Sequence, residues 1–229
     1  MVAGCRDALA ARLGVAGVVA LTPAGLDRPL PSPFLAGRAA ALEVAPAVTV
    51  VICTREHPDT LRDCLISLTD QEFTRFDVLV VDNAPASEKS KQVVEEFTDR
   101  LAIRYAVARR PGLSRARNKA LSLLGDQPGE RIVAWTDDDV RVDPHWVAEI
   151  ARAFVENPVA VAVSGAVVPA ELRTRSQIWF EQFGGHSKGR GFTPDEFGPG
   201  SAQSPLYPLL PELVARFVAV QSLRGVNPA

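Results

Sequence analysis

The sequence lacks the features that mark several large classes of protein. Its three cysteines, Cys5, Cys53 and Cys64, show neither CxxC nor zinc-site spacing, and the last two lie in apolar runs as expected for free thiols in a reducing compartment. No stretch reaches the roughly 18 apolar residues of a membrane span. An apolar run at 13–21 follows two arginines, but "LTPAGL" is a poor signal-peptide cleavage site. We therefore expect a cytoplasmic protein without a membrane span, with peripheral attachment at the inner face of the membrane left open.

The charge and the glycine spacing argue against further classes of protein. The formal net charge of -2 over 229 residues argues against a nucleic-acid binder, which usually carries a basic face. Neither G-x-G-x-x-G nor G-x-x-x-x-G-K-[ST] occurs, so a dinucleotide enzyme loses its best support and a P-loop is excluded. The remaining composition, 47% hydrophobic and 23% charged, is that of a soluble globular protein.

Regular alternation of elements begins near residue 47. Residues 1–46 are rich in Ala, Gly and Pro, and "LDRPLPSPF" at 26–34 resembles an extended linker. The next domain is expected over 47–197, and a divergent tail over 198–229. Apolar, β-branched runs predict strands at 47–54, 76–83, 101–108, 131–137 and 159–168. Amphipathic segments between them predict helices, among them one with Leu61, Cys64, Leu65 and Leu68 on a single stripe and one at 112–124 with Ser114 as a candidate cap.

Strands that alternate with helices predict an α/β fold, an open and mostly parallel sheet with helices on both faces. In such sheets ligands bind outside the carboxyl ends of the strands. Polar residues stand at three of those ends: first Thr54, Arg55 and Glu56, then Asp82 and Asn83, then Asp137, Asp138 and Asp139.

The three aspartates suggest a site for a divalent cation. In an extended strand Asp137 and Asp139 would point to one side and Asp138 to the other. Mg²⁺ or Mn²⁺ prefers oxygen ligands and commonly takes only one or two from protein and the rest from phosphates. A solvated turn is the plain alternative. An EF-hand-like loop fails because Arg141 and Val142 stand where a ligand and a glycine are needed. A phosphatase with an aspartate nucleophile would carry its D-x-D on the first strand of the sheet, whereas here the D-x-D stands at the end of the fourth predicted strand.

A cationic run follows the third predicted strand. "RRPGLSRARNKA" at 109–120 contains Arg109, Arg110, Arg115, Arg117 and Lys119 near a helix start. Positive charge at a helix N-terminus suits a diphosphate, whereas the plain alternative is a solvated helix face.

Four segments together resemble the family-2 glycosyltransferases, inverting enzymes with a GT-A fold: "VTVVICTRE", "VLVVDNAP", "RRPGLSRARNKAL" and "VAWTDDDVRVDPHWV", in that order. The resemblance covers about residues 46–197 and implies a nucleotide-diphosphate sugar donor, often a UDP-sugar. By that resemblance Thr54, Arg55 and Glu56 line the base pocket, Asp82 contacts uracil or ribose, and Arg117 lies beside the nucleotide. Asp137 and Asp138 belong to the donor site, and Asp137 and Asp139 hold the metal, with Asp139 the more direct ligand.

The resemblance fades after about residue 198. The family's general base is a carboxylate beyond the D-x-D, but the last 30 residues contain Glu212 as their only acid. Glu181 and Asp195 are weak candidates, so the catalytic residue stays unknown, and a helix starting at Pro211 is expected to pack on the sheet. We expect a C-terminally truncated copy whose tail left the ancestral reading frame. Three functions stay open: a metal-assisted glycosyltransferase with an unknown glycan, lipid or small-molecule acceptor, a catalytically incomplete nucleotide-sugar binder, and a nucleotidyltransferase-like enzyme.

Overall fold

The computed structural model describes residues 21–22, 25–26, 33–125, 131–165, 167–183 and 185. The chain divides into two compact units, residues 1–45 and 46–229. In the first unit, β1 (Leu21–Thr22) pairs antiparallel with β2 (Gly25–Leu26), and α2 spans Pro33–Val44. The extended linker expected over 26–34 therefore ends in a helix, which favourable Ala, Leu, Arg and Glu residues and a proline in the first turn explain.

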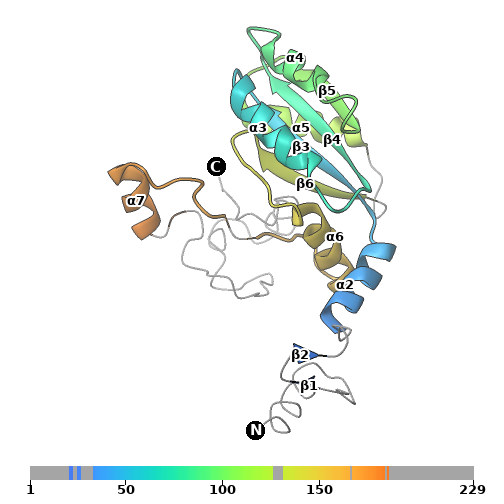
Figure 1. Cartoon of the computed structure of the whole chain (residues 1–229). Helices are drawn as coiled ribbons and strands as arrows, with labels where there is room; N and C mark the ends of the chain where they lie inside the picture. Colours follow the sequence, from blue (N-terminus) through green and yellow to red (C-terminus); the bar gives the residue numbers. More distant parts are fainter. Residues whose placement is uncertain are drawn as a thin grey trace. The chain divides into compact units, whose positions relative to one another are not determined.

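The second unit is built on a four-stranded parallel sheet in the order β5-β4-β3-β6 (Figure 1). The strands are β3 (Ala47–Thr54), β4 (Phe76–Asn83), β5 (Ile103–Ala108) and β6 (Arg131–Asp137). The helices are α3 (Pro58–Thr69), α4 (Lys89–Glu95), α5 (Leu113–Leu124), α6 (Trp146–Glu156) and α7 (Arg175–Gln182). The prediction of a mostly parallel sheet with helices on both faces is confirmed.

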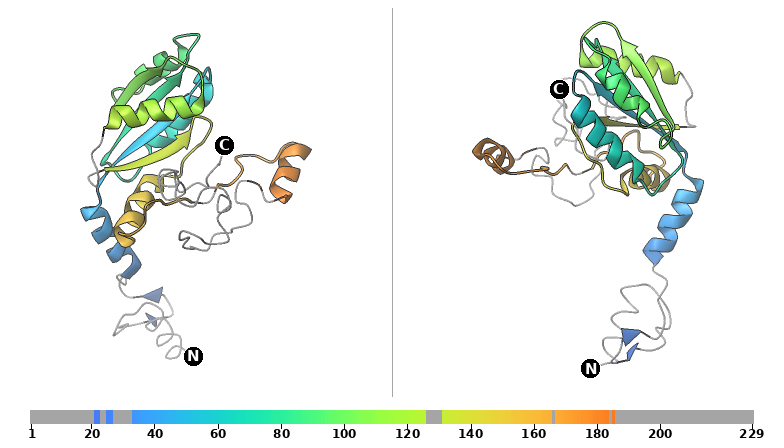
Figure 2. Two further views of the ribbon diagram at one scale, coloured as in Figure 1. Left: turned by 180° about the vertical axis from the view of Figure 1, so that it is seen from behind. Right: turned by 45° about the horizontal axis from the view of Figure 1, so that its top comes forward.

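Helices α3 and α4 cover one face of the sheet, and α5 crosses the other (Figures 1 and 2). On the α5 face, Val51 lies in register with Leu79 and Trp135, and all three pack with Ala116 and Ala120 of α5. These two alanines let the helix approach the sheet closely. The opposite face receives the predicted stripe of α3, whose residues Leu61, Cys64, Leu65 and Leu68 are all fully buried.

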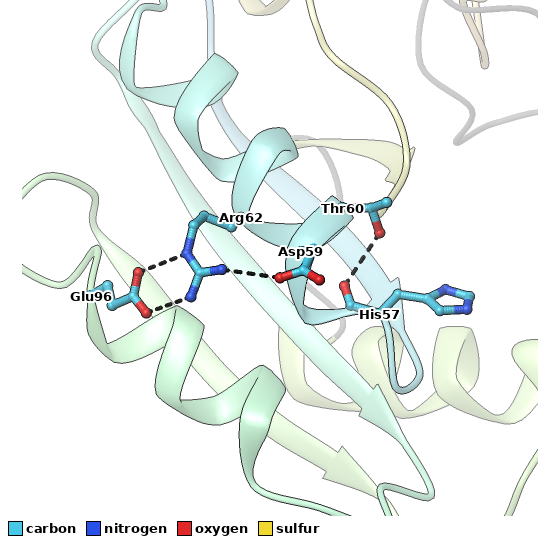
Figure 3. Close-up of polar contacts among 5 residues, drawn as sticks. All are labelled: His57, Asp59, Thr60, Arg62 and Glu96. Atoms are coloured by element: carbon cyan, nitrogen blue, oxygen red, sulfur yellow. Dashed lines mark hydrogen bonds and ion pairs between the residues drawn. The ribbon is translucent and has the colours of Figure 1, made fainter.

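Polar contacts fix the helices of that face to one another. Arg62 on α3 donates to both carboxylate oxygens of Glu96, the C-cap residue that follows α4, at 3.0 and 2.7 Å (Figure 3). At the other end of α3, Gln71 donates to the carbonyl of Asp143 at 2.8 Å and accepts from the backbone N–H of Val147 at 3.0 Å. The α3–α4 contact is exposed and screened by salt, whereas the second joins α3 to α6 through a buried amide.

The strand predicted at 159–168 is wrong. Over its described residues, 159–165 and 167–168, the chain has no strand, and Val159 and Val161 are 92% and 60% exposed. Valine-rich composition favours a strand only where a neighbouring strand supplies hydrogen bonds and cover, and no described strand pairs with this segment. The helix expected from Pro211 and the tail at 198–229 lie outside the described residues.

The start of α5 also differs from prediction, since Gly112 rather than Ser114 occupies the N-cap. Its φ of 134° lies in a region that favours glycine. Its N–H donates to Oδ1 of Asn83 at 3.0 Å, which ties the end of β4 to the start of α5. In the described part of the chain no helix is long and apolar enough to cross a membrane.

Candidate functional site

The topology places one site at the carboxyl edge of the sheet, between β3 and β6. From β3 the chain passes through α3 to β4 on one side, whereas β6 is reached through α5 on the opposite face. The strand order therefore reverses between β3 and β6, and ligands of open α/β sheets bind at such a point, outside the carboxyl ends of the strands. A hollow of about 270 Å³ lies there, lined by Cys53, Thr54, Arg55, His57, Asn83, Leu113, Asp137, Asp138 and Asp139.

The three aspartates have three different environments. Asp137 ends β6 and is half-exposed, Asp139 is exposed, and Asp138 is buried. Asp138 Oδ2 accepts a hydrogen bond from Thr54 Oγ1 at 2.6 Å and lies 3.5 Å from His57 Nδ1. Burial raises the pKa of Asp138, and the hydrogen bond from Thr54 and the His57 ring oppose that rise. Asp138 therefore anchors the β6 loop to the end of β3.

The strand alternation expected across Asp137 and Asp139 does not apply. The strand ends at Asp137, and the N–H of Val140 donates to the carbonyl of Asp137 at 3.3 Å in a turn. Both carboxylates nevertheless line the same hollow, because the turn brings Asp139 back beside the strand end.

The donor set at this turn fits a hard divalent cation that is shared with a ligand. Among the described residues no group of three or more His, Cys, Asp or Glu side chains could hold a metal ion by itself. Two carboxylates open to solvent suit Mg²⁺ or Mn²⁺, because these ions commonly take the remaining oxygens from water and substrate phosphates. Asp137 and Asp139 are the residues that would hold it.

The residues after β3 divide between the hollow and the neighbouring loop. Thr54 is 2% exposed and donates to Asp138, while Arg55 is exposed and lines the hollow. Glu56 has a φ of 55°, and its carboxylate accepts from the N–H groups of Ala86 and Ser87 at 2.7 and 3.2 Å. These contacts lower the pKa of Glu56, led by the bond from Ala86. Glu56 therefore holds the loop after β4 and does not line the hollow itself.

Asp82 is a fully buried carboxylate in register with Thr54, and it is not among the residues that line the hollow. Its Oδ2 accepts from the Tyr105 hydroxyl at 2.8 Å, and its Oδ1 has no hydrogen-bond partner among the described residues. Burial raises the pKa of Asp82, and the bond from Tyr105 opposes the rise. Burial and the nearby carboxylate also raise the pKa of the Tyr105 hydroxyl.

The raised pKa of Asp82 predicts a specific dependence of stability on pH. Between the ordinary aspartate pKa of about 3.9 and the raised value, the folded state binds more protons than the unfolded state, so stability falls as pH rises. Asp82→Asn removes this contribution. The free energy of unfolding of the variant should therefore gain on wild type as the pH rises above about 3.9, as measured by urea denaturation. A parallel Asp99→Asn variant, at an exposed site, should show no such gain. A difference between Asp82→Asn and wild type that stays constant over this range would contradict the assignment.

The cationic run splits between two sides of α5. The Arg117 guanidinium lies 3.9 Å from Asp137 Oδ1 and 5.9 Å from the centre of the Trp135 ring, which places it at the aspartate turn. Arg109, Arg110, Arg115 and Lys119 line a different hollow, along β5 and α5. The cationic run is therefore divided between the two sides of α5, because a helix directs its successive side chains around a cylinder.

Sequence reasoning missed three residues of the hollow, Cys53, His57 and Leu113, and it placed Asn83 at a strand end without assigning it to the site. Cys53 was expected to be a buried free thiol, but it is partly exposed in the wall of the hollow. The burial of most of the thiol raises its pKa to about 12. Leu113 and His57 carry no sequence signal, since only the fold brings them to this edge. Of the two weak base candidates, Glu181 lies on α7 and does not line the hollow, and Asp195 lies outside the described residues.

Comparison with known proteins decides the family. Residues 49–201 match the family described as Glycosyl transferase family 2. The chain belongs to this family. The match contains β3, β4, β5, β6 and the aspartate turn, so it confirms the resemblance carried by the four sequence segments and favours an enzyme of this class over a nucleotidyltransferase.

Individual relatives are distant. The glucosyl-dolichyl phosphate glucuronosyltransferase of Haloferax volcanii is 28% identical over 140 residues, which are 59% of this chain and 43% of that protein. The chain thus spans less than half the length of this curated relative. Among solved structures, S. aureus TarS 1-349 has a TM-score of 0.47 at 23% identity, and the match covers 56% of this chain and 37% of that one. The mannosyltransferase PcManGT of Pyrobaculum calidifontis, in complex with GDP-Man and Mn2+, has a TM-score of 0.46 at 23% identity, and the match covers 61% of this chain and 44% of that one.

Proposed function

We propose that this family-2 glycosyltransferase chain binds a nucleotide-diphosphate sugar between β3 and β6 and transfers the sugar to an acceptor hydroxyl with inversion. The main support for this proposal is that Asp137 and Asp139 line one hollow at the point where the strand order reverses, with Arg117 beside Asp137. Two carboxylates and a guanidinium at one edge suit a diphosphate and its divalent cation. TarS 1-349 and PcManGT have been solved in complex with donors of this class, UDP-GlcNAc and GDP-Man respectively.

The residues of the chain have distinct parts in this proposal. Asp137 and Asp139 bind Mn²⁺ or Mg²⁺, which when bound stabilises the negative charge that develops on the departing nucleotide diphosphate. Arg117 provides a second positive charge at the diphosphate. Arg55 is exposed and lines the hollow, whereas Asp82 is fully buried and does not line it. Thr54 and Asp138 hold the ends of β3 and β6 together in the wall of the hollow, and Glu56 holds the loop after β4.

A binding-only protein is the second candidate function. Among the described residues, the three aspartates are the only carboxylates that line the hollow, so no further carboxylate is placed there for the role of the family's general base. Inverting transfer needs a base that removes the proton of the acceptor hydroxyl. A chain without this base would still bind the donor.

Calorimetric titration of the full chain with UDP and with GDP, each with and without Mn²⁺, tests the proposal. We expect Mn²⁺-dependent binding of at least one of them, and the absence of any binding would contradict both candidates. Incubation of the chain with a nucleotide sugar that contains the nucleotide that binds then distinguishes the two candidate functions. Release of nucleotide diphosphate above the buffer rate supports the transferase, whereas binding without release supports the incomplete binder.

A further inference from the structure

A second hollow lies on the flank of the sheet, away from the point where the strand order reverses. It has a volume of about 810 Å³, against about 270 Å³ for the hollow between β3 and β6. Its walls are the edge strand β5 and the helix α5, and it is lined by Ala106, Val107, Ala108, Arg109, Arg110, Arg115, Asn118, Lys119 and Leu123. Its size lies within the range of sites that bind small molecules.

The charge of this hollow is of one sign. Four of its lining residues are cationic and none is acidic. The side chains of Arg109, Arg110 and Lys119 make no ion pair or hydrogen bond with any described residue, and Arg115 donates only to the carbonyl of Pro111, at 3.2 Å. Elsewhere on this unit, exposed cations such as Arg141 and Lys91 pair with carboxylates. Four like charges around one concave surface repel each other, and an anion bound among them would relieve that repulsion.

Helix geometry separates this hollow from the proposed donor site. At 100° per residue, Arg115, Asn118, Lys119 and Leu123 form one flank of α5, and Leu113 and Arg117 form the other. The buried stripe of Ala116 and Ala120 lies between the two flanks, against the sheet. A ligand on the β5 side therefore meets neither Arg117 nor the aspartate turn.

We propose that this groove, which we name the β5–α5 groove, binds a phosphate-bearing ligand. Arginine forks bind phosphate oxygens in pairs, Lys119 adds a point charge, and the Asn118 amide offers a further donor. Val107 and Leu123, 37% and 40% exposed, give the groove an apolar wall for the rest of such a molecule. The phosphate comes either from a soluble oligophosphate or from the headgroup of an anionic lipid. This binding is independent of the proposed donor site.

Two probes distinguish these sources on the full-length chain, both in EDTA so that no metal bridges phosphate to the aspartates. Tripolyphosphate is titrated by calorimetry, and sedimentation is measured with phosphatidylcholine vesicles with and without phosphatidylglycerol. We expect binding of tripolyphosphate, of the phosphatidylglycerol vesicles or of both, weakened by added NaCl. The double variant Arg110→Ala with Lys119→Ala should weaken it by about tenfold or more.

A charge-matched control is Lys91→Ala with Arg141→Ala, which removes two exposed cations outside the groove. It should bind both probes like wild type. The proposal is overturned if wild type binds neither probe, or if the control loses as much affinity as the groove variant. The groove variant should also keep the Mn²⁺-dependent binding of UDP or GDP. Because the groove is probed in EDTA, a failure of nucleotide binding in wild type would count against the donor site alone.

Discussion

Asp139→Ala should abolish the Mn²⁺-dependent binding of nucleotide diphosphate, with a loss in affinity of at least about 100-fold. Removing a residue that only orients a metal ligand typically costs about 10- to 100-fold, and Asp139 is proposed as a ligand itself. Asp139 is exposed at the rim of the hollow and has no part in the Thr54–Asp138 contact, so its removal should leave the fold intact. Calorimetric titration with UDP and GDP in the presence of Mn²⁺ measures the loss.

The matched control is Asp99→Ala, which removes an exposed carboxylate that does not line the hollow. It should bind the nucleotide like wild type. Nucleotide binding by Asp139→Ala at wild-type affinity, with wild-type dependence on Mn²⁺, would refute the assignment of Asp139 as a metal ligand.

Leu65→Ala should reduce the free energy of unfolding by about 2–5 kcal/mol. Leu65 is fully buried on the α3 stripe, where truncation removes apolar contact and leaves a cavity. Such a loss is a large part of the total stability expected for a domain of this size. Urea denaturation followed by circular dichroism measures it.

Ile66 provides the control for the same helix. It is the next residue and 43% exposed, so Ile66→Ala keeps the change in helix propensity similar but creates no buried cavity. Its effect should be much smaller than that of Leu65→Ala. Equal losses in the two variants would show that α3 does not pack by the predicted stripe.

Much of the sheet was predictable because its strands are covered on both faces. The bounds predicted for β3, β4 and β6 agree with the structure, and β5 begins two residues later than expected, at Ile103. Buried parallel strands appear in sequence as unbroken β-branched runs, which have few alternative explanations. The same composition at 159–168 led to a wrong prediction. Whether such a run forms a strand depends on burial by neighbouring elements, and a local sequence pattern contains no information about these.

The candidate site was predictable only in part. Strand ends located Arg55, Asp137, Asp138 and Asp139 at one edge, since parallel strands place their carboxyl ends together. The partner of each side chain was not predictable. Glu56 holds the loop at Ala86, Thr54 donates to Asp138, and Asp82 lies beneath the surface with Tyr105. Each of these contacts joins residues more than twenty positions apart, and local patterns carry no information about them.

By itself the sequence determined the parallel α/β architecture, the family and the edge of the sheet where polar groups collect. The architecture and the polar edge follow from hydrophobic periodicity and from the polar residues that directly follow the strands, and the family follows from the resemblance of four segments to known enzymes. Only the tertiary structure decided how the cations at 109–119 divide, with Arg117 at the aspartate turn and Arg109, Arg110, Arg115 and Lys119 in the β5–α5 groove. The physical reason is that a helix turns successive side chains by 100°, and the way α5 packs on the sheet determines which flank each one meets.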